Sequence, residues 1–224
     1  MRRVDRPSPN QDGRDGATID MLVLHYTGMT SAAAALDRLC DPAAKVSAHY
    51  TIDEDGTVYA MVPEDRRAWH AGVAHWAGAA NINSRSIGIE LVNPGHEFGY
   101  RAFPEEQVAV LITLCHSILV RHPIPSARVL GHSDVAPARK DDPGELFPWV
   151  RLAKAGIGLW PEKRESDLGA EALARFGYDP AAPQDKVIAA FQRHFRPRLI
   201  DGAWDGECAA LLAGLLALSP PSAV

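Results

Sequence analysis

The chain has 224 residues, a formal net charge of −5 and ordinary proportions of apolar (46%) and charged (23%) residues. These values are typical of a globular protein of one or two domains, and the negative net charge argues mildly against nucleic acid, whose binding requires a basic surface. No apolar run approaches the ~20 residues needed to cross a bilayer, so we expect neither nucleic acid nor membrane as a partner. Composition leaves the oligomeric state unknown.

The first part of the chain alternates segments typical of strands and helices. Residues 1–17 are polar and rich in proline and glycine, so we expect an irregular lead-in. Short apolar runs predict strands at 19–26, 86–92 and 129–131, and the Asp55-Gly56 pair predicts a hairpin between two alternating runs. Helical patterns cover 31–40, 104–122 and 149–157. Residues 18–161 therefore predict an α/β domain with a central mixed β-sheet flanked by helices.

The composition changes after residue 161. Residues 162–169 are charged and end in glycine, as expected of a linker. Residues 170–224, the tail, contain three segments in which apolar residues recur at helical spacing. They predict a small three-helix domain, close to the lower size limit for an independent core.

The cysteines and the N-terminus favour a cytoplasmic protein. Cys40, Cys115 and Cys208 are odd in number and form no CxxC motif, so we expect reduced thiols. The N-terminus is basic, but the apolar segment of a secretory signal does not follow it. A periplasmic protein whose natural signal is missing from this sequence is the alternative.

Three residues could form a metal site. His25 and His132 each follow a short apolar strand, from whose end a side chain can project into a cleft. Asp142 lies in a proline-bounded loop ten residues after His132. Two imidazoles and one carboxylate can bind Zn²⁺ and leave a fourth tetrahedral position for water. Spacing alone does not establish this site, because no HExxH or CxxC motif anchors it. We expect His194, which lies beside charged residues, to be solvated.

Two further residues have the chemistry of a hydrolase. Glu90 lies within an apolar strand, where a carboxylate is costly to bury and acquires the raised pKa that suits a general base. Lys140 shares its loop with Asp142 and could stabilise the negative oxygen of a tetrahedral intermediate. A plain salt bridge between Glu90 and Lys140 is the structural alternative.

Four stretches, in order, resemble motifs of the type 2 N-acetylmuramoyl-L-alanine amidases, the family that includes the peptidoglycan-recognition proteins. They cover about residues 20–161 and read LVLHYTG, SAHYTIDEDGTVYAMVPEDRRAWHAG, NINSRSIGIELVN and GHSDVAPARKDDPGELFPW. The resemblance implies the type 2 amidase fold, a Zn²⁺ cofactor and cleavage of muropeptides between N-acetylmuramic acid and L-alanine. The tail, with VIAAFQRHFRP and DGAWDGECAALLAG, resembles the small three-helix peptidoglycan-binding domain.

The resemblance also implies roles for individual residues. His25, His132 and Asp142 would be the zinc ligands, Glu90 the general base and Lys140 the oxyanion partner. The positions that would contact the substrate or shape its groove are Arg67, which would grip a carboxylate of the stem peptide, Asn83, His49, Trp69 and His70.

Departures from the family pattern narrow the expectation. Asp142 stands where phage and animal relatives often have cysteine, and Ala48 stands where they often have tyrosine. Together with Glu90, this resembles the bacterial branch that cleaves anhydromuramyl-peptides in cell-wall recycling. The second arginine that some relatives have near Asn81 is absent, so the grip on the peptide is less defined. The alternatives are a non-catalytic muropeptide-binding module, a protein with structural zinc, and a periplasmic amidase acting on intact peptidoglycan.

Overall fold

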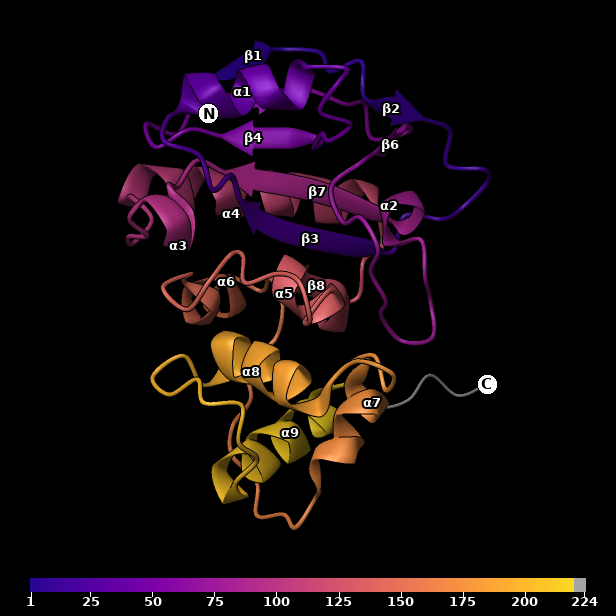
Figure 1. Cartoon of the computed structure of the whole chain (residues 1–224), viewed down its shortest axis with the longest axis vertical. Coiled ribbons are helices and arrows are strands. Elements are labelled where there is room, and N and C mark those ends of the chain that lie inside the picture. Colours follow the sequence, from indigo (N-terminus) through magenta and orange to yellow (C-terminus); the bar gives the residue numbers. More distant parts are fainter. Residues whose placement is uncertain (220–224) are drawn as a thin grey trace.

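The computed structural model describes residues 1–219, which are built around a six-stranded sheet of order β1-β5-β4-β7-β3-β8 (Figure 1). Strands β4 and β5 run antiparallel, whereas the other neighbours in this sheet are parallel, so the sheet is mixed as predicted. The strands are β1 (Arg3–Asp5), β3 (Met21–Tyr26), β4 (Tyr50–Ile52), β5 (Val58–Ala60), β7 (Ser86–Leu91) and β8 (Val129–Gly131). The short strands β2 (Gln11–Asp12) and β6 (Arg67–Ala68) form a separate antiparallel pair.

The N-terminal segment is more ordered than its sequence indicates. Within residues 1–17, β1 adds an edge to the main sheet and β2 pairs with β6. Arg14 is buried and donates hydrogen bonds to the backbone carbonyls of Glu64, Ser84 and Ser86. Edge strands of two or three residues leave no alternating apolar pattern, so a sequence reading misses them.

The predicted helices form where local signals place them. Helix α1 (Ala32–Cys40) begins after Ser31, whose hydroxyl accepts a hydrogen bond from the backbone N–H of Ala34. Helix α4 (Glu105–Arg121) begins after Pro104 and has two acidic residues in its first turn, which the helix dipole favours. The remaining helices are α2 (Ile82–Arg85), α3 (Gly95–Phe98), α5 (His132–Val135), α6 (Trp149–Lys154), α7 (Leu173–Phe176), α8 (Gln184–Phe195) and α9 (Gly206–Leu218).

Different apolar clusters lie on the two faces of the sheet. Leu22 and Leu24 of β3 belong to an apolar cluster that includes Leu111 of α4. Met21 and Val23 alternate with them and belong to a second cluster, which contains apolar side chains of α7, α8 and α9. Helix α4 therefore covers one face of the sheet, and the second cluster continues from the other face into the tail, which lies beyond β8 (Figure 1).

The tail and the sheet share one core. Phe191 of α8 and Leu212 of α9 are fully buried in the same cluster as Met21 and Val23. The segment expected to be a linker packs against the tail, since the N–H of Arg164 donates to the carbonyl of Ala210 at 3.0 Å. The boundary near residue 162 remains a prediction from composition, and the apolar core runs across it.

Two further findings bear on cellular context. None of the helices within residues 1–219 has the length and apolar character needed to cross a membrane. Cys115 and Cys208 are buried and Cys40 is partly exposed, and all three are free thiols.

Candidate active site

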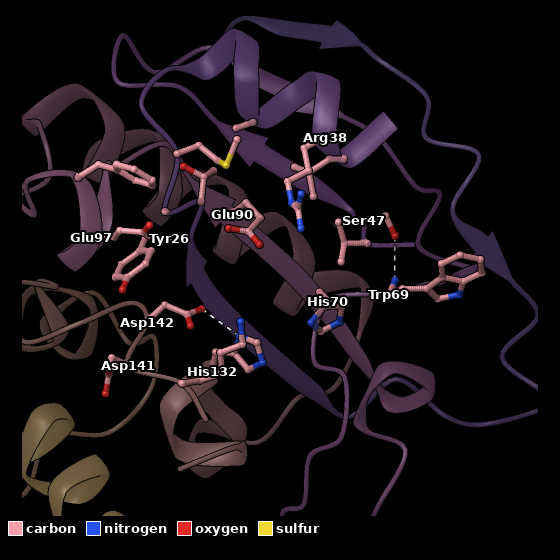
Figure 2. A pocket seen from close by; sticks show the side chains of 18 of the residues that line it. Tyr26, Arg38, Ser47, Trp69, His70, Glu90, Glu97, His132, Asp141 and Asp142 are labelled. Carbon is pink, nitrogen blue, oxygen red and sulfur yellow. Dashed lines mark hydrogen bonds and ion pairs between the residues drawn. The ribbon is translucent and has the colours of Figure 1, made fainter. Parts of the chain in front are cut away.

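The site lies where three neighbouring parallel strands end. His25 and Glu90 are register partners near the ends of β3 and β7, and His132 follows directly after β8. Carboxyl ends of parallel strands meet at one edge of a sheet, which is the usual place for ligands in such sheets. Asp142 reaches this edge from the loop after α5 (Figure 2).

The predicted ligand atoms form a compact triangle. The Nδ1 atoms of His25 and His132 are 3.0 Å apart, and each is 3.0 Å from Oδ2 of Asp142. Tetrahedral zinc ligands at about 2.0–2.1 Å from the metal are separated by about 3.3 Å. The three side chains therefore need only a slight expansion to bind Zn²⁺ together.

Hydrogen bonds behind the triangle fix the tautomer of His25. The hydroxyl of Ser86 donates to the carbonyl of Ile82, so its oxygen is left to accept the Nε2–H of His70, 3.0 Å away. Nδ1 of His70 must then accept, and the group facing it at 3.0 Å is Nε2–H of His25. His25 consequently presents the lone pair of Nδ1 to the triangle.

His132 is oriented in the same way. Its Nε2 lies 3.1 Å from the carbonyl oxygen of Ala71, which can only accept, so its Nδ1 also carries a lone pair. Two imidazole lone pairs and a carboxylate oxygen then converge with no proton between them. Such a set of acceptors repels itself unless it holds a cation, and a metal ion fits this requirement.

The charge states agree with this assignment. Burial, together with the neighbouring His132, lowers the pKa of His25 to about 4. Burial would raise the pKa of Asp142, but His132 and His25 outweigh it and hold that pKa well below its usual range. At neutral pH the triangle thus contains an unprotonated His25 and a carboxylate, the forms that bind metal.

Asn83 and Gly88 hold the segment that supports both histidines. The side-chain oxygen of Asn83 accepts hydrogen bonds from the N–H groups of His70 (3.1 Å) and Ala71 (2.7 Å). A Cβ at position 88 would lie 2.4 Å from Cγ of His70, so glycine is required where the imidazole lies on β7. This segment supplies an acceptor for each histidine of the triangle, the side-chain Nδ1 of His70 for His25 and the carbonyl of Ala71 for His132.

A cavity of ≈ 580 Å³ opens beside the triangle. Glu90, Lys140, His132 and Asp142 line it, and Figure 2 shows Arg38 extending into it from α1 on the side of Glu90. Burial and the nearby Asp142 raise the pKa of Glu90 well above its ordinary value, and its Oε2 has no hydrogen-bond partner. Among the ion pairs within residues 1–219, none joins Glu90 to Lys140.

The structure places only some of the residues expected to contact substrate in the lining of the cavity. Trp69 and His70 line the cavity, although His70 also bonds to His25. Arg67 lies outside the cavity lining and binds Asp12 at 2.7 Å. Asn83 and His49 are buried and also absent from the lining, with Nδ1 of His49 accepting the N–H of Gly88 at 2.9 Å.

Sequence reasoning missed some residues of the site and misjudged another. Arg38 and Arg139 line the cavity, but an arginine in the last turn of α1 or in the turn after α5 has no distinguishing sequence pattern. The expectation of a solvated His194 is wrong, because this residue is 3% exposed and bonds to Asp134 at 2.7 Å. Its partner lies 60 residues earlier in the chain, so no local pattern could have revealed it.

Comparison with known proteins identifies relatives of the whole arrangement. A family model described as N-acetylmuramoyl-L-alanine amidase matches residues 15–145. The amidase AmiD of Escherichia coli K12 is 38% identical over 88% of this chain and 82% of its own length. The 1,6-anhydro-N-acetylmuramyl-L-alanine amidase AmpD of Citrobacter freundii is 34% identical over 67% of this chain and 87% of its own.

Solved structures agree. The complex of Escherichia coli AmiD with anhydro-N-acetylmuramic acid-L-Ala-D-γ-Glu-L-Lys has a TM-score of 0.80 at 37% identity and covers 91% of each chain. AmpDh3 of Pseudomonas aeruginosa has a TM-score of 0.80 at 36% identity, covering 90% of this chain and 92% of its own. This coverage extends the likeness into the tail. From its sequence and its fold, the chain belongs to the N-acetylmuramoyl-L-alanine amidase family.

Proposed function

We propose that this protein is a zinc-dependent hydrolase that acts on muropeptides. It cleaves the amide between the lactyl group of N-acetylmuramic acid, including the 1,6-anhydro form, and L-alanine. The convergence of two Nδ1 lone pairs and the Asp142 carboxylate beside the unpartnered Glu90 is the observation that carries this proposal. The AmiD complex, which holds an anhydromuramyl-peptide substrate, supports the choice of bond.

The three residues of the triangle and their neighbours Glu90 and Lys140 have separate roles in the reaction. His25, His132 and Asp142 hold Zn²⁺, which when bound supplies Lewis acidity toward the scissile carbonyl and the attacking water. Glu90 takes a proton from that water and passes it to the nitrogen of the departing alanine, a role that its raised pKa favours. Lys140, which lines the same cavity, stabilises the oxygen that becomes negative.

Recognition of the peptide falls to cations on the cavity wall. A muropeptide carries carboxylates, and Arg38 lies in the cavity lining with its side chain directed inward (Figure 2). In this proposal Arg38 takes the part expected of Arg67, because the guanidinium of Arg67 is already bound to Asp12. Trp69 shapes the same groove, while Asn83 and His49 act from behind it by fixing backbone.

Two other readings of the site are weaker. A binding module without catalysis would not need an unpaired, desolvated carboxylate next to its metal ligands. A structural zinc site is normally closed by four protein ligands, whereas this triangle has three and borders a cavity.

We also propose a cytoplasmic location and a role in cell-wall recycling. Free cysteines, two of them buried, suit a reducing compartment. A periplasmic amidase acting on intact peptidoglycan remains the alternative, and the tail would then serve as a wall-binding domain.

One experiment tests the activity and the substrate class together. The zinc-loaded protein is offered anhydromuramyl-tripeptide and, separately, intact sacculi, with and without chelator, and released peptides are read by mass spectrometry. Chelator-sensitive release from the soluble substrate alone supports the recycling role. Release from sacculi as well favours a periplasmic enzyme, and release from neither refutes the hydrolase.

A further inference from the structure

One buried carboxylate connects the metal-ligand loop to the tail. Asp134 lies two residues after His132, in α5, and is 1% exposed. Its Oδ2 accepts hydrogen bonds from the N–H of Gly131 and from Nδ1 of His194, and its Oδ1 accepts one from the hydroxyl of Tyr178, each at 2.7 Å. Two of these three donors belong to the tail, so the tail supplies most of the hydrogen bonds that this carboxylate accepts.

A second contact reaches the other end of the same loop. Arg193 precedes His194 in α8 and binds Oδ1 of Asp141 at 2.8 Å. Asp141 separates Lys140 from the ligand Asp142. Two consecutive residues of α8 therefore hold the start and the end of the loop that carries two metal ligands and the lysine.

The surroundings fix α8 in place. The imidazole of His194 stacks on Trp149 at the start of α6, with ring centroids 3.7 Å apart, and on Phe195 at 3.8 Å. Figure 1 shows α8 as the part of the tail nearest to α5 and β8. Phe191 of the same helix is fully buried in the core shared with the sheet.

We propose that α8 is a positioning element of the metal centre: through His194 and Arg193, with Tyr178 beside them, the tail sets the course of the ligand loop. Apolar contacts alone would keep the tail attached to the sheet, but they have little directional preference. Hydrogen bonds to a buried carboxylate have a defined geometry, so they fix where α5 begins and where His132 points. The tail of this chain thus completes the active site, whether or not it also binds the wall. This inference rests on the proposed zinc site.

The test compares variants that each remove one side-chain contact from the tail. Tyr178→Phe removes a donor to Asp134, and Arg193→Gln removes the ion pair with Asp141. Trp204→Phe is the control, because it removes a hydrogen bond within the tail, from the indole N–H to the carbonyl of Leu168, and alters packing beside Phe191 of α8 without touching a contact to Asp134 or Asp141. The full chain is used throughout. The measurements are the zinc dissociation constant by competition with a chelator, the thermal midpoint of the zinc-free protein, and kcat and KM.

We expect Tyr178→Phe and Arg193→Gln each to weaken zinc binding about tenfold, at the lower end of the effects found for residues that support metal ligands. We expect Trp204→Phe to bind zinc as the wild type does, even if its thermal midpoint falls as far as those of the other two variants. The inference is wrong if the first two variants bind zinc like the control, or if the control loses as much affinity. Should Tyr178→Phe fail to fold, Arg193→Gln decides by the same criterion. A wild type that binds no zinc or releases no peptide would instead refute the proposed function.

Discussion

Replacement of His70 by phenylalanine tests whether the imidazole behind His25 serves the metal or the substrate. Nδ1 of His70 accepts the Nε2–H of His25 at 3.0 Å, and its ring lies directly over Gly88. Phenylalanine keeps a flat ring of similar size in that space but offers no acceptor. The substitution therefore removes two hydrogen bonds, the one from His25 and the one to the hydroxyl of Ser86, and keeps an aromatic ring in the same space; Ser86 retains its bond to the carbonyl of Ile82.

The expected effect follows from where His25 then places its proton. A buried N–H without an acceptor costs about 1–3 kcal/mol. His25 avoids this cost by moving its proton to Nδ1 and donating to Asp142, 3.0 Å away. That tautomer has no lone pair on Nδ1 for the metal. Zinc binding must therefore restore the unfavourable tautomer, and the free energy of binding is reduced by that amount. It corresponds to about a 10–100-fold rise in the zinc dissociation constant, the range typical of such supporting residues.

The assay is competition for zinc with a chelator of known affinity, together with steady-state kinetics at saturating zinc. Trp69→Phe is the control, because Trp69 lines the same cavity without a bond to a ligand histidine. We expect this control to change KM and to leave zinc affinity unaltered. If His70→Phe binds zinc as tightly as the wild type and only raises KM, then His70 shapes the groove and the tautomer argument is refuted.

Three other changes have defined outcomes. Glu90→Gln should retain zinc, measured by metal analysis, and lose about 10²–10⁴ in kcat, as loss of a general base does; near-wild-type turnover would exclude this role. Lys140→Met should lower kcat by about 10²–10³ with little change in KM, and a change confined to KM would assign it to substrate binding. Burial raises the pKa of Glu64, but hydrogen bonds from Arg121, Tyr50 and His122 outweigh it and lower that pKa to about 2. The wild type should therefore be more stable than Glu64→Gln by about 1–2 kcal/mol above pH 4.5, allowing for solvent screening, and the margin should shrink as the pH falls toward 2. Urea unfolding of both proteins at pH 7 and pH 3 checks this, and a constant margin contradicts it.

The sequence could predict those parts of the fold that have local signals. Ser31 caps α1, Asp55-Gly56 turns the hairpin and Pro104 starts α4, each within one turn of the element it defines. The convergence of His25 and His132 was predictable for a related reason, since they lie near the end of β3 and directly after β8, strand ends that a parallel sheet aligns at one edge. The predicted mixed sheet with flanking helices is confirmed by the related structures.

The remainder depends on contacts between distant segments. An apolar helical face shows that something packs against it but not what, so the sequence does not reveal that Met21 and Phe191 belong to one core. The direction of the Arg67 side chain is set by Asp12, 55 residues earlier. His194 looks solvated beside its charged neighbours, and its burial depends on Asp134 and Trp149.

The shared core also has a consequence for folding during synthesis of the protein. Strand β3 precedes in the chain every helix of the apolar cluster to which Met21 and Val23 belong, and α7, α8 and α9, the last helices of the described residues, complete that cluster. A nascent chain therefore carries an unfinished sheet face through most of its synthesis, and such surfaces invite association with chaperones. The contacts of Asp134 and Asp141 with His194 and Arg193 likewise form only after α8 has been synthesised.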